Sequence, residues 1–251
     1  MKQPRVLVIF GSKSDAGVYQ PLLEILGPEF KSDLAILSAH RNFRELEQRL
    51  SKKDFDLVIA GAGLSAHLPG VVAAQFDGPV LGIPVASRLG GLDAFFSISQ
   101  MPKGVPVLAT FPEASEQAVT FLKSVLSKPF NRKINLVCKD LYWQYEYSNE
   151  FFTEAQSCAE ELELSWTTQA TPSPDALNIF VITDPLDFNQ LTKAHTGIYV
   201  PMMEPIKAKS STRAIEIFEW ARTHGPWVGL NNFVNAVKMA DKIVKLQEQF
   251  I

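Results

Sequence analysis

The sequence has few cysteines, no long apolar run and no large excess of charge. Its two cysteines, Cys138 and Cys158, lack metal-ligand spacing, which argues against a zinc site and fits a reducing compartment. No apolar stretch approaches the roughly 20 residues needed to span a bilayer, and the first one, Val6–Phe10, is too short for a signal-peptide core. The net charge of −3 gives no reason to expect nucleic acid or a membrane surface as a partner. We therefore expect a soluble, cytoplasmic protein.

What the chain does contain is a regular alternation of apolar runs and helical patterns. It has 251 residues, of which 46% are hydrophobic, enough for one large domain or two ordinary ones. Strands alternating with helices predict a parallel sheet covered on both faces, a three-layer α/β arrangement. The expected strands of the first half are Val6–Phe10, Leu34–Leu37, Leu57–Ala60, Pro79–Val85 and Val105–Ala109, and the expected helices include 42–50, 94–100 and 114–126.

The second half repeats the order and spacing of the first, with few identities. After a polar break at 128–133, strands are expected at 134–138, 179–182 and 197–201 and helices at 149–162 and 212–222, before a last helix. The pattern predicts a tandem duplication, with one domain at 1–128 and a degenerate, structural copy at 133–251. The loops of this copy, 139–142, 171–174 and 183–185, carry none of the residues described below, and His195 and His224 are interpreted as structural or surface residues.

The loop after the first expected strand reads Gly11-Ser12-Lys13-Ser14-Asp15. Free backbone N–H groups and the helix dipole can receive an anion at such a point, and the serine hydroxyls can donate to phosphate oxygens. The Asp15 carboxylate would repel phosphate and is better suited to a sugar diol. Taken alone, the loop is better explained by Ser14 or Asp15 simply capping the helix. The Gly-x-Gly-x-x-Gly and Walker patterns are absent, so the loop indicates no particular nucleotide.

Two further loops follow buried strands and carry histidines. Ser38-Ala39-His40-Arg41 sets a titratable imidazole beside a permanent cation that can clamp phosphate. The stretch from Ala60 to Gly70 passes through Gly61 and Gly63, which allow close approach to bare amides, before His67. Loops at the carboxyl ends of parallel strands face the ligand crevice. Read singly, each loop also fits an ordinary turn with a surface histidine.

Together and in this order, the three loops resemble the PurE family, as does Ser99–Val107. The resemblance covers residues 5 to about 110 and implies a flavodoxin-like fold acting in purine biosynthesis. The loop Gly-Ala-Gly-x-x-Ala-His-Leu-Pro-Gly is similar to that of the mutase class. That class interconverts N5-carboxyaminoimidazole ribonucleotide and 4-carboxy-5-aminoimidazole ribonucleotide. The implied partner is this small ribonucleotide, and no metal, ATP or organic cofactor is implied.

Carried onto this sequence, the resemblance implies two catalytic histidines. His40 would serve as general acid and base, because an imidazole with a pKa near neutrality suits both halves of a carboxyl transfer. His67 would shape or polarise the pocket. Ser12 and Arg41 would hold the phosphate and Asp15 the ribose. The other implied substrate-binding residues are Gly11, Ser38, Ala39, Gly61, Ala62, Gly63, Leu64, Ser65, Ala66 and Leu68.

The resemblance also implies an oligomeric assembly, and it leaves three alternative functions open. Single-domain family members form octamers, so a fused pair implies a homotetramer that forms a pseudo-octamer. The segment Thr110–Ala114 is less glycine-rich than the family pattern, which would alter a wall between subunits. The rivals are a carboxylase that uses carbon dioxide directly, a non-catalytic nucleotide-binding homologue, and an unrelated α/β module that binds FMN or a phosphorylated sugar.

Overall fold

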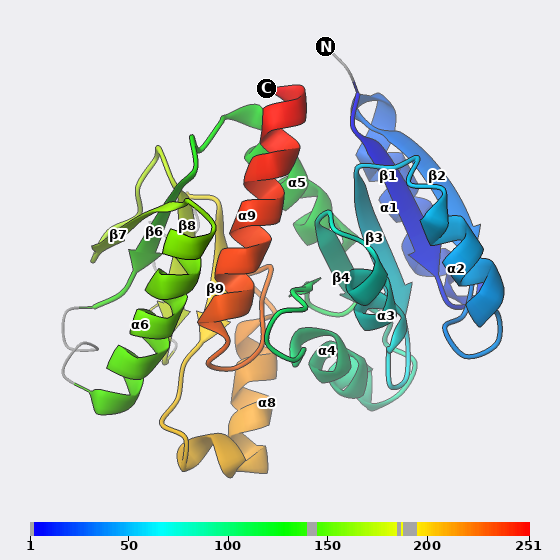
Figure 1. The fold of residues 1–251 in the computed structure, drawn as a ribbon. Coiled ribbons are helices and arrows are strands. Elements are labelled where there is room, and N and C mark those ends of the chain that lie inside the picture. The colour runs from blue at the N-terminus through cyan, green and yellow to red at the C-terminus, as the bar shows by residue number, and fades with distance from the viewer. Residues whose placement is uncertain (1–2, 140–144, 185–186, 188–194) are drawn as a thin grey trace.

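Two parallel sheets flanked by helices make up the molecule (Figure 1). The structure is a computed structural model that describes residues 3–139, 145–184, 187 and 195–251. Within this part of the chain, no helix is long and apolar enough to cross a membrane. Residues 140–142 of the loop expected at 139–142, and residue 185 at the end of the loop expected at 183–185, lie outside the described residues.

The first sheet has the strand order β2-β1-β3-β4-β5, and every neighbouring pair is parallel. This is the flavodoxin-like order, in which ligands bind at the carboxyl edge. Its strands are β1 (Arg5–Phe10), β2 (Lys31–Ile36), β3 (Leu57–Ala62), β4 (Val80–Pro84) and β5 (Leu108–Ala109). Its helices are α1 (Ala16–Leu26), α2 (Phe43–Ser51), α3 (Leu68–Gln75), α4 (Leu92–Ser99) and α5 (Ser115–Ser127).

The second sheet repeats this order over four strands, β7-β6-β8-β9, again all parallel. The fold class predicted from the sequence, a parallel α/β arrangement present twice, is therefore confirmed. The strands are β6 (Lys133–Val137), β7 (Ser165–Gln169), β8 (Leu177–Ile182) and β9 (Gly197–Pro201). The helices are α6 (Glu146–Glu161), α8 (Ser211–Trp220) and α9 (Phe233–Phe250).

Trp227 joins the two sheets. Its backbone bridges Tyr199 of β9 in parallel and Ala109 of β5 in antiparallel fashion. The Ala109 N–H donates to the Trp227 carbonyl at 2.7 Å, and the Trp227 N–H donates back to Ala109 at 2.8 Å. Its indole is fully buried and its indole N–H donates to the His224 carbonyl. One residue thus takes the place of a fifth strand in the second sheet and connects it to the first.

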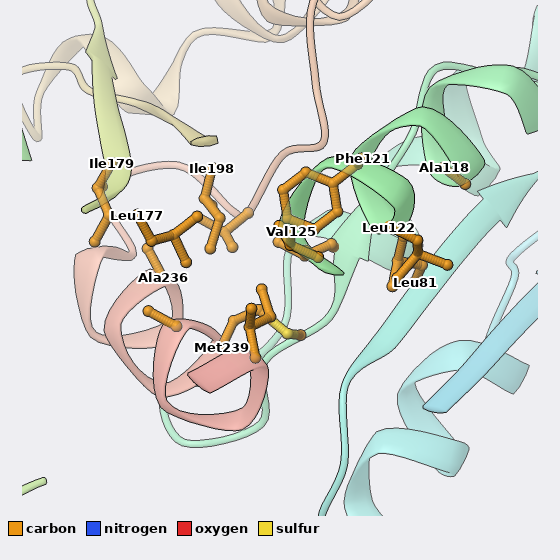
Figure 2. Close-up of a cluster of buried hydrophobic side chains, with 14 of the residues drawn as sticks. Leu81, Ala118, Phe121, Leu122, Val125, Leu177, Ile179, Ile198, Ala236 and Met239 are labelled. Carbon is orange, nitrogen blue, oxygen red and sulfur yellow. The ribbon is translucent and has the colours of Figure 1, made fainter. Parts of the chain in front are cut away.

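The hydrophobic core runs through both halves. One cluster of buried side chains contains residues of β4, α5, β8, β9 and α9 (Figure 2). Phe121 and Val125 of α5 lie toward Ile198 in that view, and Met239 of α9 lies below them. Since α5 and α9 each contribute to this cluster, the two sheets are packed into one body by apolar contact as well as by the Trp227 bridge.

Two strands differ from the sequence-based expectation for identifiable reasons. The fifth strand was expected over Val105–Ala109 but only Leu108–Ala109 pairs with β4. Pro106 has no N–H to donate, and the Gly104 N–H and Val105 carbonyl bond to Asn235 of α9 instead. Strand β7 is absent from the sequence-based expectation, because its exposure alternates at a sheet edge and its residues are mostly polar.

Candidate active site

A cavity of about 550 Å³ opens at the carboxyl edge of the first sheet. It is bounded by the loops that follow β1, β2, β3 and β4. The parallel register sets Phe10 beside Gly61 and Ala62 beside Pro84, so these strands end at one level. Fold geometry alone therefore brings together residues that lie up to 76 positions apart, from Gly11 to Ser87.

The first loop wraps into a short 3-10 turn, Lys13–Asp15, ahead of α1. The Ser12 hydroxyl caps this turn by accepting from the Ser14 N–H at 3.2 Å, and the Ser14 hydroxyl lies 2.7 Å from Ser12 Oγ and 3.1 Å from Asp15 Oδ1. The Asp15 side chain makes no helix-cap hydrogen bond. Partial burial raises the pKa of this carboxyl. The loop therefore presents two hydroxyls and one partly desolvated carboxylate to the cavity.

The second loop is held by Ser38, which is 9% exposed. Its hydroxyl accepts weakly from the N–H groups of His40 and Arg41, at 3.3 and 3.4 Å. The Arg41 guanidinium donates to the Gly11 carbonyl at 2.9 Å. This bond ties the loop after β2 to the loop after β1 and brings a permanent positive charge to the Ser12 side of the cavity.

The two site histidines meet across the cavity. His40 Nε2 lies 3.0 Å from His67 Nδ1, and the rings stand edge to face with their centroids 5.1 Å apart. When both rings are neutral, one of these two nitrogens donates and the other accepts, so one proton lies in the hydrogen bond between the rings. His67 also immediately precedes α3, and its carbonyl accepts from the Val71 N–H at 3.0 Å. The helix start thereby fixes the backbone that carries the ring.

The third loop forms a wall from Ala62 to Ala66, in which every residue except Leu64 is small. Leu64 has a positive φ of 49°, which L-residues seldom adopt. Its N–H donates to the Ser87 hydroxyl at 3.0 Å. Because Ala62 and Gly63 carry no large side chain, a ligand can lie against the backbone of this segment.

The structure brings all but one of the predicted site residues to the cavity lining. The exception is Gly61, which lies inside β3 and accepts the Gly11 N–H at 3.1 Å. A side chain at Gly61 would collide with the Phe10 ring, so this glycine serves packing next to the cavity. Two lining residues were not among the predicted site residues, Ser14 and Ser87. Their signal in the sequence was position, since both follow a buried strand at its carboxyl end.

This geometry suits a small molecule that carries an anionic group and exchanges a proton. Hydroxyls and a guanidinium gather at one side, where they can bind an anion. The imidazole pair can give and take a proton. The wall of small residues can exclude water from the reacting atoms.

A model of the AIR carboxylase family matches residues 5–132. The chain belongs to this family. All the strands of the first sheet and the whole lining of the cavity fall inside the matched residues. The family's pattern therefore coincides with the part of the fold that builds the site.

Curated relatives in the family carry one function in their names. The N5-carboxyaminoimidazole ribonucleotide mutase of Thermotoga maritima is 43% identical over 129 residues, which are 49% of this chain and 75% of that protein. A probable N5-carboxyaminoimidazole ribonucleotide mutase of Methanothermobacter thermautotrophicus is 38% identical over 128 residues, which are 49% of this chain. The chain spans 38% of the length of this second relative.

A solved structure was also matched. The PurE protein of Treponema denticola has a TM-score of 0.42 and 21% identity, over 64% of this chain and 98% of that one.

Proposed function

We propose that the chain is a mutase that converts N5-carboxyaminoimidazole ribonucleotide to 4-carboxy-5-aminoimidazole ribonucleotide. The observation that carries the proposal is the His40–His67 pair, 3.0 Å apart and in one cavity with the Ser12 and Arg41 loops. The names of the relatives support the same reaction.

In the proposed binding mode, the nucleotide's phosphate lies against the Ser12 hydroxyl and the Arg41 guanidinium. The bond from Arg41 to the Gly11 carbonyl already holds the guanidinium near the Ser12 loop. Asp15 accepts hydrogen bonds from the ribose diol. Binding there replaces water around a carboxyl that burial already disfavours in its ionised form.

The reaction moves a carboxyl group from the exocyclic nitrogen to a ring carbon. One proton must move in the opposite direction, from the ring carbon to the nitrogen. His40 donates a proton to the exocyclic nitrogen as its bond to the carboxyl carbon breaks, which leaves an amine and carbon dioxide. The ring carbon then attacks carbon dioxide, a carbon–carbon bond forms, and the ring proton returns to His40. The wall from Gly63 to Ala66 keeps carbon dioxide beside the ring between the two steps. His67, at hydrogen-bond distance from His40, orients the imidazole and shares its proton.

The test is a mutase assay on the purified chain beside His40→Asn. Asparagine keeps a polar side chain of similar reach but cannot transfer a proton, so turnover should fall by roughly 100-fold or more. Binding of the nucleotide, measured by calorimetry, should persist. Full activity in His40→Asn, or a wild-type chain that binds the nucleotide without isomerising it, would refute the proposal. Dependence on bicarbonate with aminoimidazole ribonucleotide as substrate would show the direct carboxylase instead.

We also propose that the chain is a tandem duplication with domains at 1–128 and 133–251. The two sheets share one strand order. The backbone entering α5 at Ala114 (φ −80°, ψ 64°) matches that entering α9 at Asn232 (φ −98°, ψ 63°). The contacts are reciprocal: Asn235 of α9 binds the turn at Gly104, and Gln117 of α5 packs against the turn at Gly225.

The proposed assembly is a homotetramer that forms a pseudo-octamer. If each chain stands for two subunits of a single-domain relative, four chains complete the assembly. Light scattering on the full chain should then give a mass of about four chains. A monomer at the working concentration would refute this assembly without touching the chemistry.

A further inference from the structure

The wall of the cavity contains a strained residue. Leu64 has a φ of 49°, and the residue is 54% exposed, so it is not held by a buried apolar core. Backbone in this region persists only where surrounding contacts fix it. Two hydrogen bonds hold the Leu64 backbone: its carbonyl accepts the Ala66 N–H at 2.6 Å within the loop, and its N–H donates to Ser87 Oγ at 3.0 Å. The Ser87 bond connects Leu64 to a neighbouring loop.

Ser87 is itself anchored to the sheet. Its N–H donates to the Val85 carbonyl at 2.9 Å, and the Val85 N–H donates to the Ala62 carbonyl at 2.9 Å. The ends of β3 and β4 are therefore connected to the wall through a chain of bonds that ends at the Ser87 hydroxyl. These bonds connect the exposed loop to the buried sheet and restrict the loop's motion.

Gly63 makes room for this contact. A Cβ at Gly63 would lie 2.9 Å from Ser87 Oγ and 3.1 Å from Ser87 Cβ. A larger residue there would push the serine away. Glycine at position 63 thus serves two purposes: it lets a ligand approach the backbone, and it leaves space for the Ser87 side chain. Ser87 lines the same cavity as His40 and His67.

We infer that Ser87 is a positioning residue that keeps the wall closed on carbon dioxide between the two halves of the reaction. This inference rests on the proposed mutase function and adds a residue to it. Ser87 acts through the Gly63–Leu64 backbone, and it transfers no proton to the substrate.

The consequence of losing Ser87 follows from the chemistry. After the first step the cavity holds an amine and carbon dioxide, and His40 has given up its proton. If carbon dioxide stays, the ring carbon takes it up and the ring proton returns to His40. If carbon dioxide escapes, the amine leaves as aminoimidazole ribonucleotide and His40 regains its proton from water. A loosened wall therefore raises the ratio of leaked amine to carboxylated product.

The experiment measures this ratio for the full chain and for Ser87→Ala. The uncatalysed decay of the substrate is subtracted from each value. Losing one hydrogen bond of this kind should raise the ratio roughly fivefold to tenfold, while KM changes little because Ser12 and Arg41 are untouched. Ser87→Thr retains the hydroxyl and should restore most of the coupling. Gly63→Ala, which displaces Ser87 from the other side, should leak as Ser87→Ala does.

Ser51→Ala is the matched control. Its hydroxyl also makes one hydrogen bond, to the Gln48 carbonyl at 2.9 Å, and it lies outside the cavity lining. It should keep the wild-type ratio. A wild-type ratio in Ser87→Ala, or equal leakage in Ser87→Ala and Ser87→Thr, would overturn the role of Ser87. A wild-type chain that never forms the carboxylated product would overturn the proposed function, and this role with it.

Discussion

Replacing Asn235 by alanine should destabilise the whole chain, because this side chain joins the two halves. Asn235 is 1% exposed. Its carbonyl oxygen accepts the Gly104 N–H at 2.8 Å, and its amide donates to the carbonyls of Pro102 at 3.0 Å and Val105 at 3.4 Å. Alanine would leave all three backbone groups without these partners.

The magnitude follows from the two short bonds and the groups they satisfy. Each hydrogen bond contributes about 1 kcal/mol net, and a buried group left unpaired costs about 1–3 kcal/mol. The bond to Val105 is long and adds little. We expect the free energy of unfolding to fall by about 2–4 kcal/mol, and the melting temperature by roughly 4–16 °C at this chain length.

The assay is urea unfolding of the full, ligand-free chain followed by circular dichroism. Asn235→Asp separates hydrogen bonding from packing, because it keeps the volume but turns an oxygen toward the Pro102 carbonyl. It should destabilise at least as much as alanine does. Asn149→Ala, an exposed change on α6, should stay within about 0.5 kcal/mol of wild type. A similarly small effect of Asn235→Ala would refute the reasoning.

Three further changes test local features. Gly61→Ala drives a methyl group into the Phe10 ring and should lower the free energy of unfolding by about 1–3 kcal/mol, whereas Gly17→Ala, in open space on α1, should raise it by about 0.5–1 kcal/mol in the same urea titration. Because burial raises the pKa of Asp15, its ionised form costs stability, so Asp15→Asn should be more stable than wild type at neutral pH. That difference should shrink as the pH falls through the raised pKa toward the ordinary value of 3.8, which unfolding at a series of pH values would check. Burial also raises the pKa of the Cys158 thiol, which is 8% exposed, so a thiol reagent should label it only after unfolding.

The buried parts of the fold were readable from the sequence because they depend on local apolar runs. Strands β3 and β4 are buried at every position, and both were expected from such runs. Strand β7 has alternating, mostly polar residues at a sheet edge, so its pairing with β6 decides its conformation. The same holds for Val105, whose carbonyl bonds to a side chain 130 positions away. No local sequence pattern predicts a hydrogen-bond partner that lies so far away along the chain.

The candidate site also has features that could be predicted from the sequence and features that could not. The three loops could be predicted because the carboxyl ends of parallel strands meet at one edge. The 3.0 Å approach of His40 to His67 depends on how two of those loops turn, and the sequence could only place both in one crevice. The position of Ser87 after β4 could have suggested that it lies near the site, but the sequence gives no sign of its role. Its importance lies in one bond to the backbone of Leu64, 23 positions earlier.

The carboxyl edge of the second sheet shows why repeated folds need not repeat a site. There the buried Asp187 carboxylate accepts from the Thr183 N–H at 2.6 Å, the Thr183 hydroxyl at 2.9 Å and the Asp184 N–H at 3.1 Å. Lys139 pairs with its other oxygen at 2.6 Å. Donors that could have faced an incoming anion are thus occupied by the protein's own carboxylate, whose charge would repel phosphate. The sheet beneath them is kept by apolar burial, which does not depend on these loops. Among the described residues, we therefore expect the phosphate-binding crevice at the first sheet and not at the described loops of the second.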